Sequence, residues 1–295
     1  MSYYLPLTSG CSNNTCAFCY YYGSKLQMRD IEEVKAEIDA LHLYRTQRIG
    51  VPGMDPVVYM LANQWDGRRV FLQDGDALVY PFPRLIEALD YLNDRFPDLE
   101  RIAVYATAQD IMRRSVEQLR ELKKRKLTIL YVGLESGDDE ILREVGKNAT
   151  SADMIAAAQR VDQVGLDLSA MVILGLGGVE KSERHALATA DVLSRMDPEF
   201  GAALTLTVVE GTPMHDLIES GRFQPISPLQ SLRELRTIVA NLNVSNCFFS
   251  SMHASNYLTI RGTLPQERSK MLAILDRVLE KGDSSALRPE GLRGL

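Results

Sequence analysis

Three of the four cysteines lie close together near the start of the chain, in the segment GCSNNTCAFCYYYG. Cys11, Cys16 and Cys19 have the spacing C-x4-C-x2-C. Thiolates are the soft ligands that hold iron–sulfur clusters, and three of them can bind three irons of a [4Fe–4S] cubane. The fourth iron would then keep an open coordination position, to which a ligand or a substrate can bind directly.

Three further roles are open to these cysteines. Cysteine often acts as a small buried apolar residue, but this loop of Ser, Asn and Thr has no core character. A structural zinc ion requires a fourth ligand, and the nearest histidine in the sequence is His42. A plant-type ferredoxin cluster shares the C-x4-C-x2-C spacing but needs one more cysteine, for which Cys247 remains. We interpret Cys247, in the segment SNCFFS, as a buried strand or loop residue.

The composition of the 295-residue chain is that of a globular protein, with 45% hydrophobic and 24% charged residues. No apolar run approaches the ~18 residues of a membrane span, and the first residues lack a secretory signal. A net charge of −6 disfavours a large nucleic-acid surface. Because the cysteines are clustered rather than spread as disulfide partners, we expect a cytoplasmic protein. We expect no binding to membranes, and binding to nucleic acid is disfavoured.

Short apolar runs alternate with amphipathic stretches of helical period. Strands are predicted at residues 3–7, 70–73, 102–106, 128–133, 168–174 and 204–209. Helices are predicted between them, the first over residues 31–41 with Asp30 as its N-cap. This alternation gives parallel strands joined by right-handed crossovers. The sequence therefore predicts the α/β class, with a partial (β/α)6 barrel of the TIM type rather than a complete barrel of eight units.

The strand signal fades after residue 224. Residues 1–223 are expected to form the barrel, and residues 224–295 a C-terminal helical extension with helices over 227–243 and 266–281. Between these helices, residues 245–265 form a predicted loop rich in polar side chains, including His253, Asn256 and Tyr257. One interpretation is a lid that closes over the barrel mouth and contacts the substrate. The simpler one is a surface loop whose polar side chains bond the local backbone.

The cysteine loop and the motifs that follow it resemble the radical S-adenosylmethionine (SAM) superfamily, over about residues 3–213. Members of this family usually carry C-x3-C-x2-C with an aromatic residue before the last cysteine. Phe18 stands at that aromatic position, whereas the first gap is one residue longer here. The resemblance implies that Cys11, Cys16 and Cys19 bind a [4Fe–4S] cluster and that Phe18 lies beside it. The segment GLESG is similar to that of members related to methylthiotransferases, elongator-type proteins and coproporphyrinogen dehydrogenases.

Two segments are similar to the SAM-binding motifs of the family. Asp74-Gly75-Asp76 follows the second main strand, where a Gly-Gly-Glu-like motif binds the amino group of the methionine part. A carboxylate and a tight turn remain available there for an ammonium group. Glu135 and Ser136 lie in GLESG after the fourth strand, and the resemblance implies that they contact the ribose or the carboxylate of SAM.

Two further segments complete the resemblance. Gly175 follows the fifth strand in MVILGLGG, and Val208 and Val209 belong to the sixth strand in LTLTVVEGTPM. By resemblance, Gly175 and the backbone near the two valines form the adenine pocket. Each motif is weak alone, but their occurrence in the family's order supports the assignment.

Together the motifs imply reductive cleavage of SAM to a 5′-deoxyadenosyl radical, which abstracts a hydrogen atom from a substrate. We expect a small-molecule substrate, an oxidoreductase or lyase reaction, and an electron donor such as flavodoxin or ferredoxin. Activity should require anaerobic conditions. One alternative keeps this chemistry but acts on tRNA or a peptide. Another is an iron–sulfur or heme-handling carrier without radical chemistry.

Overall fold

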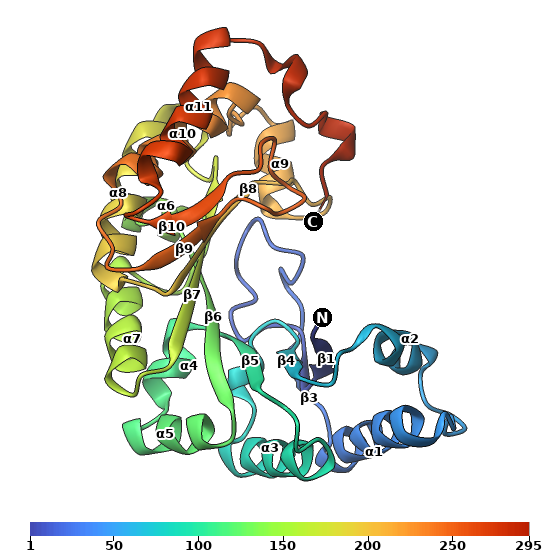
Figure 1. The fold of residues 1–295 in the computed structure, drawn as a ribbon. Coiled ribbons are helices and arrows are strands. Elements are labelled where there is room, and N and C mark those ends of the chain that lie inside the picture. Colours follow the sequence, from blue (N-terminus) through green and yellow to red (C-terminus); the bar gives the residue numbers. More distant parts are fainter. Residues whose placement is uncertain (295) are drawn as a thin grey trace. The chain divides into compact units, whose positions relative to one another are not determined.

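The computed structural model describes residues 1–294. The chain packs as two compact units (Figure 1). The first unit contains residues 1–14, 24–131 and 160–166, and the second contains residues 15–23, 132–159 and those from 167 onward. Among the described residues, no helix is both long and apolar enough to cross a lipid bilayer.

The first unit consists of short strands with helices between them. Strands β1, β4 and β5 are parallel neighbours in this order, and β6 follows β5 in the sheet and continues into the second unit. The elements are β1 (Tyr3–Pro6), β2 (Thr8–Ser9), β3 (Gln27–Met28), α1 (Ile31–Gln47), α2 (Pro56–Gln64), β4 (Arg69–Gln73), η1 (Ala77–Val79), α3 (Phe82–Arg95), β5 (Arg101–Ala106), α4 (Ala108–Arg113), α5 (Val116–Lys124) and β6 (Leu127–Glu135).

The second unit continues the alternation and ends with an antiparallel pair of strands. Strands β7, β8 and β9 are parallel neighbours, and β10 pairs antiparallel with β9. The elements are α6 (Asp139–Glu144), α7 (Ser151–Gln163), β7 (Asp167–Leu174), α8 (Gly178–Met196), β8 (Phe200–Thr205), α9 (Pro213–Glu219), α10 (Pro228–Asn241), β9 (Cys247–Ser250), β10 (Arg261–Leu264), α11 (Arg268–Lys281), η2 (Ser284–Ala286) and η3 (Glu290–Leu292).

Helix α1 shows how the sequence pattern produces the fold of the first unit. Asp30 caps the helix as predicted, because its Oδ1 accepts a hydrogen bond from the Glu32 N–H at 2.9 Å. The apolar stripe Val34, Ile38 and Leu41 is fully buried. Figure 1 shows α1 beside α3, against which it packs. Burial of each such side chain contributes roughly 1.5–3 kcal/mol.

The predicted α/β class is confirmed. The six expected strands correspond to β1, β4, β5, β6, β7 and β8, which follow one another in the sheet in chain order. The pairings β1–β4, β4–β5 and β7–β8 are parallel. This is the mostly parallel sheet that a partial barrel requires.

The sixth strand was predicted too late in the sequence. It was expected over residues 204–209, but β8 spans Phe200–Thr205. The small residues at its start are needed because Phe249 of β9 packs over them: a Cβ on Gly201 would lie 2.7 Å from the Phe249 ring. The strand ends at Thr205, whose N–H and hydroxyl donate to side chains of residues 255 and 256. Val208 and Val209 therefore lie beyond the strand.

The C-terminal region contains strands that the sequence did not predict. Residues 245–265, expected as a loop, include β9 and β10, while the two predicted helices correspond to α10 and α11. Cys247 begins β9 and is fully buried, as interpreted from the sequence. Burial raises the pKa of its thiol to about 12, so this side chain is a core residue rather than a ready metal ligand.

We expect Gly201→Ala to destabilise the second unit. The added methyl group would overlap the Phe249 ring, and such overpacking typically costs about 1–3 kcal/mol of unfolding free energy. Urea unfolding of the full chain measures this change. Gly291→Ala is the matched control, because no atom lies within 4 Å of its added Cβ. Equal stability of the two variants would contradict the close β8–β9 packing.

Candidate functional site

The cysteine loop begins directly after the first strands. Cys11 follows β2 and Gly10 and belongs to the first unit, whereas Cys16 and Cys19 belong to the second. Cys16 is buried, and the other two are half-buried. The Cys19 N–H donates to the Cys16 carbonyl at 3.1 Å, so a tight turn connects these two cysteines.

The second half of the loop is fixed by backbone hydrogen bonds. The Ala17 N–H donates to the Val145 carbonyl at 2.7 Å, and the Ala17 carbonyl accepts from the Met214 N–H at 3.0 Å. Phe18 packs against an apolar cluster that includes Val145, Met214 and Ile141. The predicted aromatic residue therefore helps to position the loop through apolar packing.

The surroundings of Cys16 suit a ligand that is deprotonated by a metal. Burial raises the pKa of the Cys16 thiol to about 11, Lys147 opposes this effect, and Glu135 adds to it. The Lys147 ammonium lies 3.1 Å from Glu135 Oε1, so the two charges largely compensate each other. A bound metal ion deprotonates a coordinating thiol outright. Iron would therefore supply the positive charge that this thiolate needs.

The predicted Asp74-Gly75-Asp76 turn lies against the start of the cysteine loop in the first unit. The buried carboxylate of Asp76 accepts the Ser12 N–H, with distances of 3.2 and 3.1 Å to its two oxygens. A Cβ on Gly75 would lie 2.2 Å from the Gly10 carbonyl oxygen and 3.0 Å from the Cys11 Cβ. Position 75 therefore requires glycine, because any side chain there would overlap the backbone of the cysteine loop.

The two carboxylates of this turn differ in their surroundings. Burial, together with the nearby carboxyl of Asp110, raises the pKa of Asp76 to about 7, although its bonds from Ser12 oppose the shift. Asp74 is half-buried, and its N–H donates to Thr8 Oγ1 at 3.2 Å. Asp76 thus holds the backbone of the cysteine loop through the Ser12 N–H, a role that could not be predicted from the sequence.

Glu135 ends β6 and Ser136 follows it, and the two residues have different roles. Glu135 has a positive φ of 65° and forms the ion pair with Lys147. Ser136 is fully buried, and its hydroxyl accepts from the Asp138 N–H at 3.1 Å and lies 2.8 Å from His185 Nδ1. Burial lowers the pKa of His185 to about 4, so the imidazole is neutral; its Nε2–H donates to the Ile173 carbonyl at 3.0 Å, which leaves Nδ1 to accept the Ser136 hydroxyl proton. Ser136 therefore orients the turn through its hydrogen bonds.

Gly175 begins a turn that is fixed by a residue from the C-terminal region. Its φ is 86°, and its N–H donates to Glu234 Oε2 at 2.7 Å. The Ser182 hydroxyl donates to Glu234 Oε1 at 2.6 Å. Burial raises the pKa of Glu234 to about 7, although both hydrogen bonds oppose this shift. Glu234 was not predicted from the sequence; it stands on the buried apolar face of α10 beside Leu235.

A cavity of about 360 Å³ lies at the carboxyl ends of β7 and β8. It is lined by Gly175 and Val208, two predicted SAM-binding residues, and by Tyr257 from the predicted lid. Val209 is not among the lining residues, and its carbonyl accepts the Thr212 hydroxyl at 2.6 Å. The carboxyl ends of parallel strands are where α/β barrels bind their ligands.

Arg293 near the C-terminus completes one wall of this cavity. Its guanidinium donates to the Leu206 carbonyl at 2.7 Å, the Ser255 carbonyl at 2.6 Å and the Tyr257 hydroxyl at 2.6 Å. It also stacks on the Tyr257 ring, 4.3 Å from its centre. The Tyr257 hydroxyl in turn donates to Glu290 at 2.6 Å. The segment after β8 is therefore held in place by the end of the chain.

The other two residues of the predicted lid support local structure. Asn256 is buried, accepts from the Thr205 hydroxyl at 2.8 Å and donates to the Ala203 carbonyl at 2.7 Å. His253 Nδ1 lies 2.9 Å from the Ser255 hydroxyl, and burial lowers the pKa of this histidine. These contacts correspond to the simpler expectation from the sequence, in which the polar side chains bond nearby groups.

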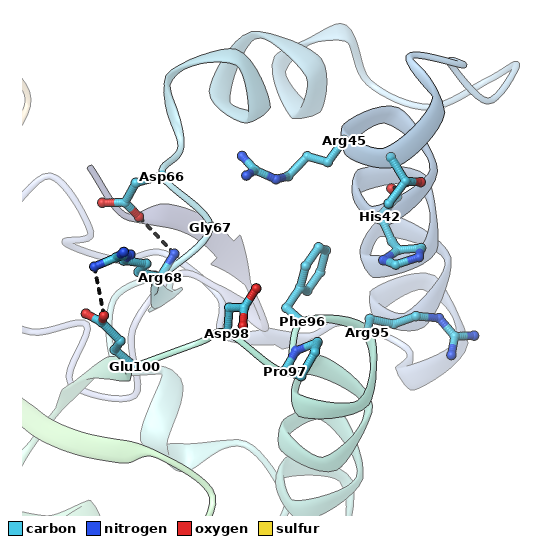
Figure 2. A pocket seen from close by; sticks show the side chains of 11 residues that line it. His42, Arg45, Asp66, Gly67, Arg68, Arg95, Phe96, Pro97, Asp98 and Glu100 are labelled. Atoms are coloured by element: carbon cyan, nitrogen blue, oxygen red, sulfur yellow. Dashed lines mark hydrogen bonds and ion pairs between the residues drawn. The ribbon is translucent and has the colours of Figure 1, made fainter.

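A larger cavity, of about 660 Å³, lies in the first unit and contains none of the predicted site residues. Figure 2 shows its mixture of arginines and carboxylates, with Arg68 paired to Glu100 and the Arg68 N–H donating to Asp66. Arg45 stacks on Trp65 at 4.9 Å and donates to its carbonyl. The cavity borders the starts of β4 and β5, whereas the Asp74 turn follows the end of β4.

Comparison with known proteins assigns the family. The model of the radical SAM superfamily matches residues 5–190, which include the whole cysteine loop. The chain belongs to the radical SAM superfamily. Proteins of this superfamily bind a [4Fe–4S] cluster and SAM, as the resemblance in the sequence implied.

Individual radical SAM relatives are distant. The chain is 23% identical over 229 residues to the heme chaperone HemW of Bacillus subtilis (strain 168), covering 76% of this chain and 55% of HemW. It is 22% identical over 219 residues to the putative methylthiotransferase MJ0865 of Methanocaldococcus jannaschii, covering 73% and 43%. The chain thus spans about half the length of these two relatives.

The fold of this radical SAM chain is similar to that of coproporphyrinogen III oxidase (HemN) from Escherichia coli. The TM-score is 0.54 with 15% identity, covering 81% of this chain and 51% of HemN. At this identity the likeness concerns the fold alone. Among described residues, no three His, Cys, Asp or Glu side chains converge as a single metal ion requires. A [4Fe–4S] cubane does not require three ligands on one ion, because each of three irons binds one thiolate.

Glu234 should make the stability of this radical SAM protein depend on pH. Its folded-state pKa of about 7 exceeds the ordinary value of 4.5, so the folded state retains a proton that the unfolded state has lost. The free energy of unfolding should therefore fall as pH rises from 4.5 to 7, by about 3 kcal/mol from this group. Urea unfolding of the wild type and Glu234→Gln over this range isolates the effect. Parallel profiles would refute it.

Arg293→Ala should destabilise the wall of the small cavity. The substitution leaves the Leu206 and Ser255 carbonyls without their charged donor, which we expect to cost about 3 kcal/mol. Arg293→Lys should recover only part of this loss, because lysine lacks the planar fork of donors. Arg277→Ala, at an exposed position of α11, is the control. Urea midpoints that are equal for Arg293→Ala and the control would contradict the assignment.

Proposed function

We propose that the chain is a radical SAM enzyme in which Cys11, Cys16 and Cys19 bind three irons of a [4Fe–4S] cluster. The observation that carries the proposal is their C-x4-C-x2-C spacing, inside a segment that matches the superfamily model. When bound, the cluster supplies one electron to SAM, whose cleavage gives the radical that abstracts hydrogen from the substrate. The chain's own residues position the reactants and exclude water.

Two parts of the first unit support this role. The Asp76 carboxylate orients the Ser12 N–H and thereby fixes the backbone next to Cys11. Gly75 allows the turn to approach that backbone closely. We assign the carboxylate of Asp74 to the ammonium group of SAM, since Asp76 is already engaged by Ser12.

The second unit supplies the remaining SAM contacts in this proposal. Glu135 binds the ribose or the amino acid part, with Lys147 balancing its charge. Gly175, Val208 and the backbone near Val209 contact the adenine. Ser136 positions the turn after β6 rather than touching SAM, because its hydroxyl is bonded to His185 and the Asp138 N–H.

The substrate in this proposal is a small molecule and the reaction is that of an oxidoreductase or a lyase. Of the three lid residues, Tyr257 lines the cavity at the ends of β7 and β8, and its hydroxyl, bonded to Arg293 and Glu290, gives it the role of supporting the cavity wall. A flavodoxin or ferredoxin in the cytoplasm would supply the electron. The C-terminal region contributes through Glu234, Tyr257 and Arg293, which hold the cavity wall in place.

A heme-handling carrier without radical chemistry is the second candidate function. It is supported by the match to the heme chaperone HemW, which covers 76% of this chain. The two candidates differ in one product. A carrier with an intact cluster yields no 5′-deoxyadenosine from SAM under reducing conditions, whereas a radical enzyme does.

Replacement of each cluster cysteine by alanine should abolish cluster binding and 5′-deoxyadenosine formation. Each change removes one iron ligand, and two thiolates do not hold a cubane that needs three. The measurements are iron content and absorbance after anaerobic reconstitution, followed by product analysis with SAM and dithionite. Cys247→Ala is the matched control and should retain both properties, because Cys247 is a core residue of β9 and not a cluster ligand. Full iron content in the three cysteine variants would refute the ligand assignment.

A further inference from the structure

Four aromatic rings form a continuous wall on one face of the strands of the first unit. Tyr4 of β1 lies 6.1 Å from Phe71 of β4, measured between ring centres. Phe71 lies 4.7 Å from Tyr105 of β5 and 4.9 Å from Tyr131 at the middle of β6. Each of the four strands thus contributes one ring, and Phe71 is at the centre. We call these four residues the aromatic wall.

The aromatic wall faces away from the helices of the unit. Side chains alternate between the two faces of a sheet, so the residues next to the wall in sequence point to the opposite face. Among them Leu5, Leu72 and Val104 are fully buried. Phe71, Tyr105 and Tyr131 are half-buried, and Tyr4 at the edge of the wall is exposed, with 37% of its surface accessible. Ala103, which pairs with Phe71 across β4 and β5, is small enough to let the rings of the neighbouring strands meet. The sheet therefore presents an aromatic surface that its own helices do not cover.

The hydroxyl groups of the aromatic wall are not used by the protein. Among residues 1–294, no protein group forms a hydrogen bond with the hydroxyls of Tyr4, Tyr105 or Tyr131. Tyrosines elsewhere in the same unit behave differently: Tyr3 donates to Glu37 at 2.7 Å, and Tyr80 donates to the Arg29 carbonyl at 2.8 Å. Buried tyrosine hydroxyls ordinarily have partners. Three phenols on one face without protein partners are therefore available to a ligand.

The charge around the wall limits the class of ligand. The four side chains carry no positive charge at neutral pH. Burial, with added contributions from Tyr131, Tyr4 and the carboxylate of Asp74, raises the pKa of Tyr105. A carboxylate close to the rings disfavours an anion, and the ring faces favour stacking or edge contacts with another π-system. The wall lies on the strands that lead to the Asp74 turn, next to Cys11.

We propose that the aromatic wall binds the substrate, and that the substrate is a planar aromatic ring system with neutral hydrogen-bonding substituents. The ring stacks against Phe71 and Tyr105, and its substituents bond the hydroxyls of Tyr4, Tyr105 and Tyr131. The inference rests on the proposed function, because it gives the wall the role of presenting a substrate to the radical. It deepens that function by naming the chemical class on which the enzyme acts.

Binding of a model aromatic compound to the full chain tests the proposal without the cluster. The probe is 2-naphthol, and its saturated counterpart decahydro-2-naphthol has the same hydroxyl but no π-system. Isothermal titration calorimetry should show binding of 2-naphthol and at least roughly threefold weaker binding of the saturated compound, because the aromatic contribution is lost. Equal binding of both compounds, or binding of neither, would overturn the proposal.

Substitutions in the wall localise the binding. Phe71→Leu and Tyr105→Leu should each weaken 2-naphthol binding roughly three- to tenfold, as expected for the loss of one aromatic contact. Tyr105→Phe keeps the ring and the fold, and should weaken binding less, through the lost hydroxyl. The control is Tyr44→Leu, because Tyr44 forms a ring pair of 4.8 Å with Tyr59 outside the wall. Equal effects of Tyr44→Leu and Tyr105→Leu would refute the location.

The outcome can be separated from that of the proposed function. If the cluster forms and 5′-deoxyadenosine appears but 2-naphthol does not bind, the substrate class is wrong and the radical chemistry stands. If 2-naphthol binds the wall but no 5′-deoxyadenosine forms with an intact cluster, the wall is a binding site and the proposed radical enzyme is wrong.

Discussion

The hydrogen bond from the Ser12 N–H to the buried Asp76 carboxylate is the constraint on which the cysteine loop depends in the first unit. It fixes the backbone one residue after Cys11, and Gly75 allows the turn to lie close enough for the bond to form. In the second unit, the bonds of Ala17 to Val145 and Met214 do the same for the residue after Cys16. Metal ligands held by such contacts lose little further conformational freedom when a cluster binds.

Residues far along the chain complete the region at the ends of β7 and β8. Glu234 of α10 holds the Gly175 N–H, and Arg293 holds the Leu206 carbonyl. Both are ionisable side chains that are almost fully buried, and burial raises the pKa of Glu234 to about 7. Burying a charge is costly unless each polar atom is bonded, and here the bonds are made to backbone groups of the cavity wall. The C-terminal region therefore contributes to the site as structural support.

Much of this arrangement could be predicted from local sequence patterns. The cysteine spacing indicated the family, and the period of Val34, Ile38 and Leu41 indicated α1, because both signals depend on residues close in sequence. Helix α2 was missed although Asp55 and Pro56 are a typical cap and first-turn pair.

Features that depend on distant partners could not be predicted in this way. The start of β8 is set by packing of Phe249 against Gly201, and β9 and β10 are set by their pairing with each other and with β8. For Asn256 the sequence left a lid residue and a local structural residue equally open, because its partners, Thr205 and Ala203, lie some fifty residues earlier in the chain. Composition of a loop alone does not distinguish such a buried amide from one exposed to a ligand.

The burial of Cys16 also has a consequence for handling the protein without metal. A thiol with a pKa of about 11 is almost entirely protonated at neutral pH, and only the thiolate reacts quickly with alkylating agents or oxidants. In the metal-free chain, Cys11 and Cys19 should therefore be oxidised by air or alkylated by iodoacetamide before Cys16, since both are more accessible to solvent. Loading with iron must also expel the Cys16 proton, so slightly alkaline buffer favours incorporation.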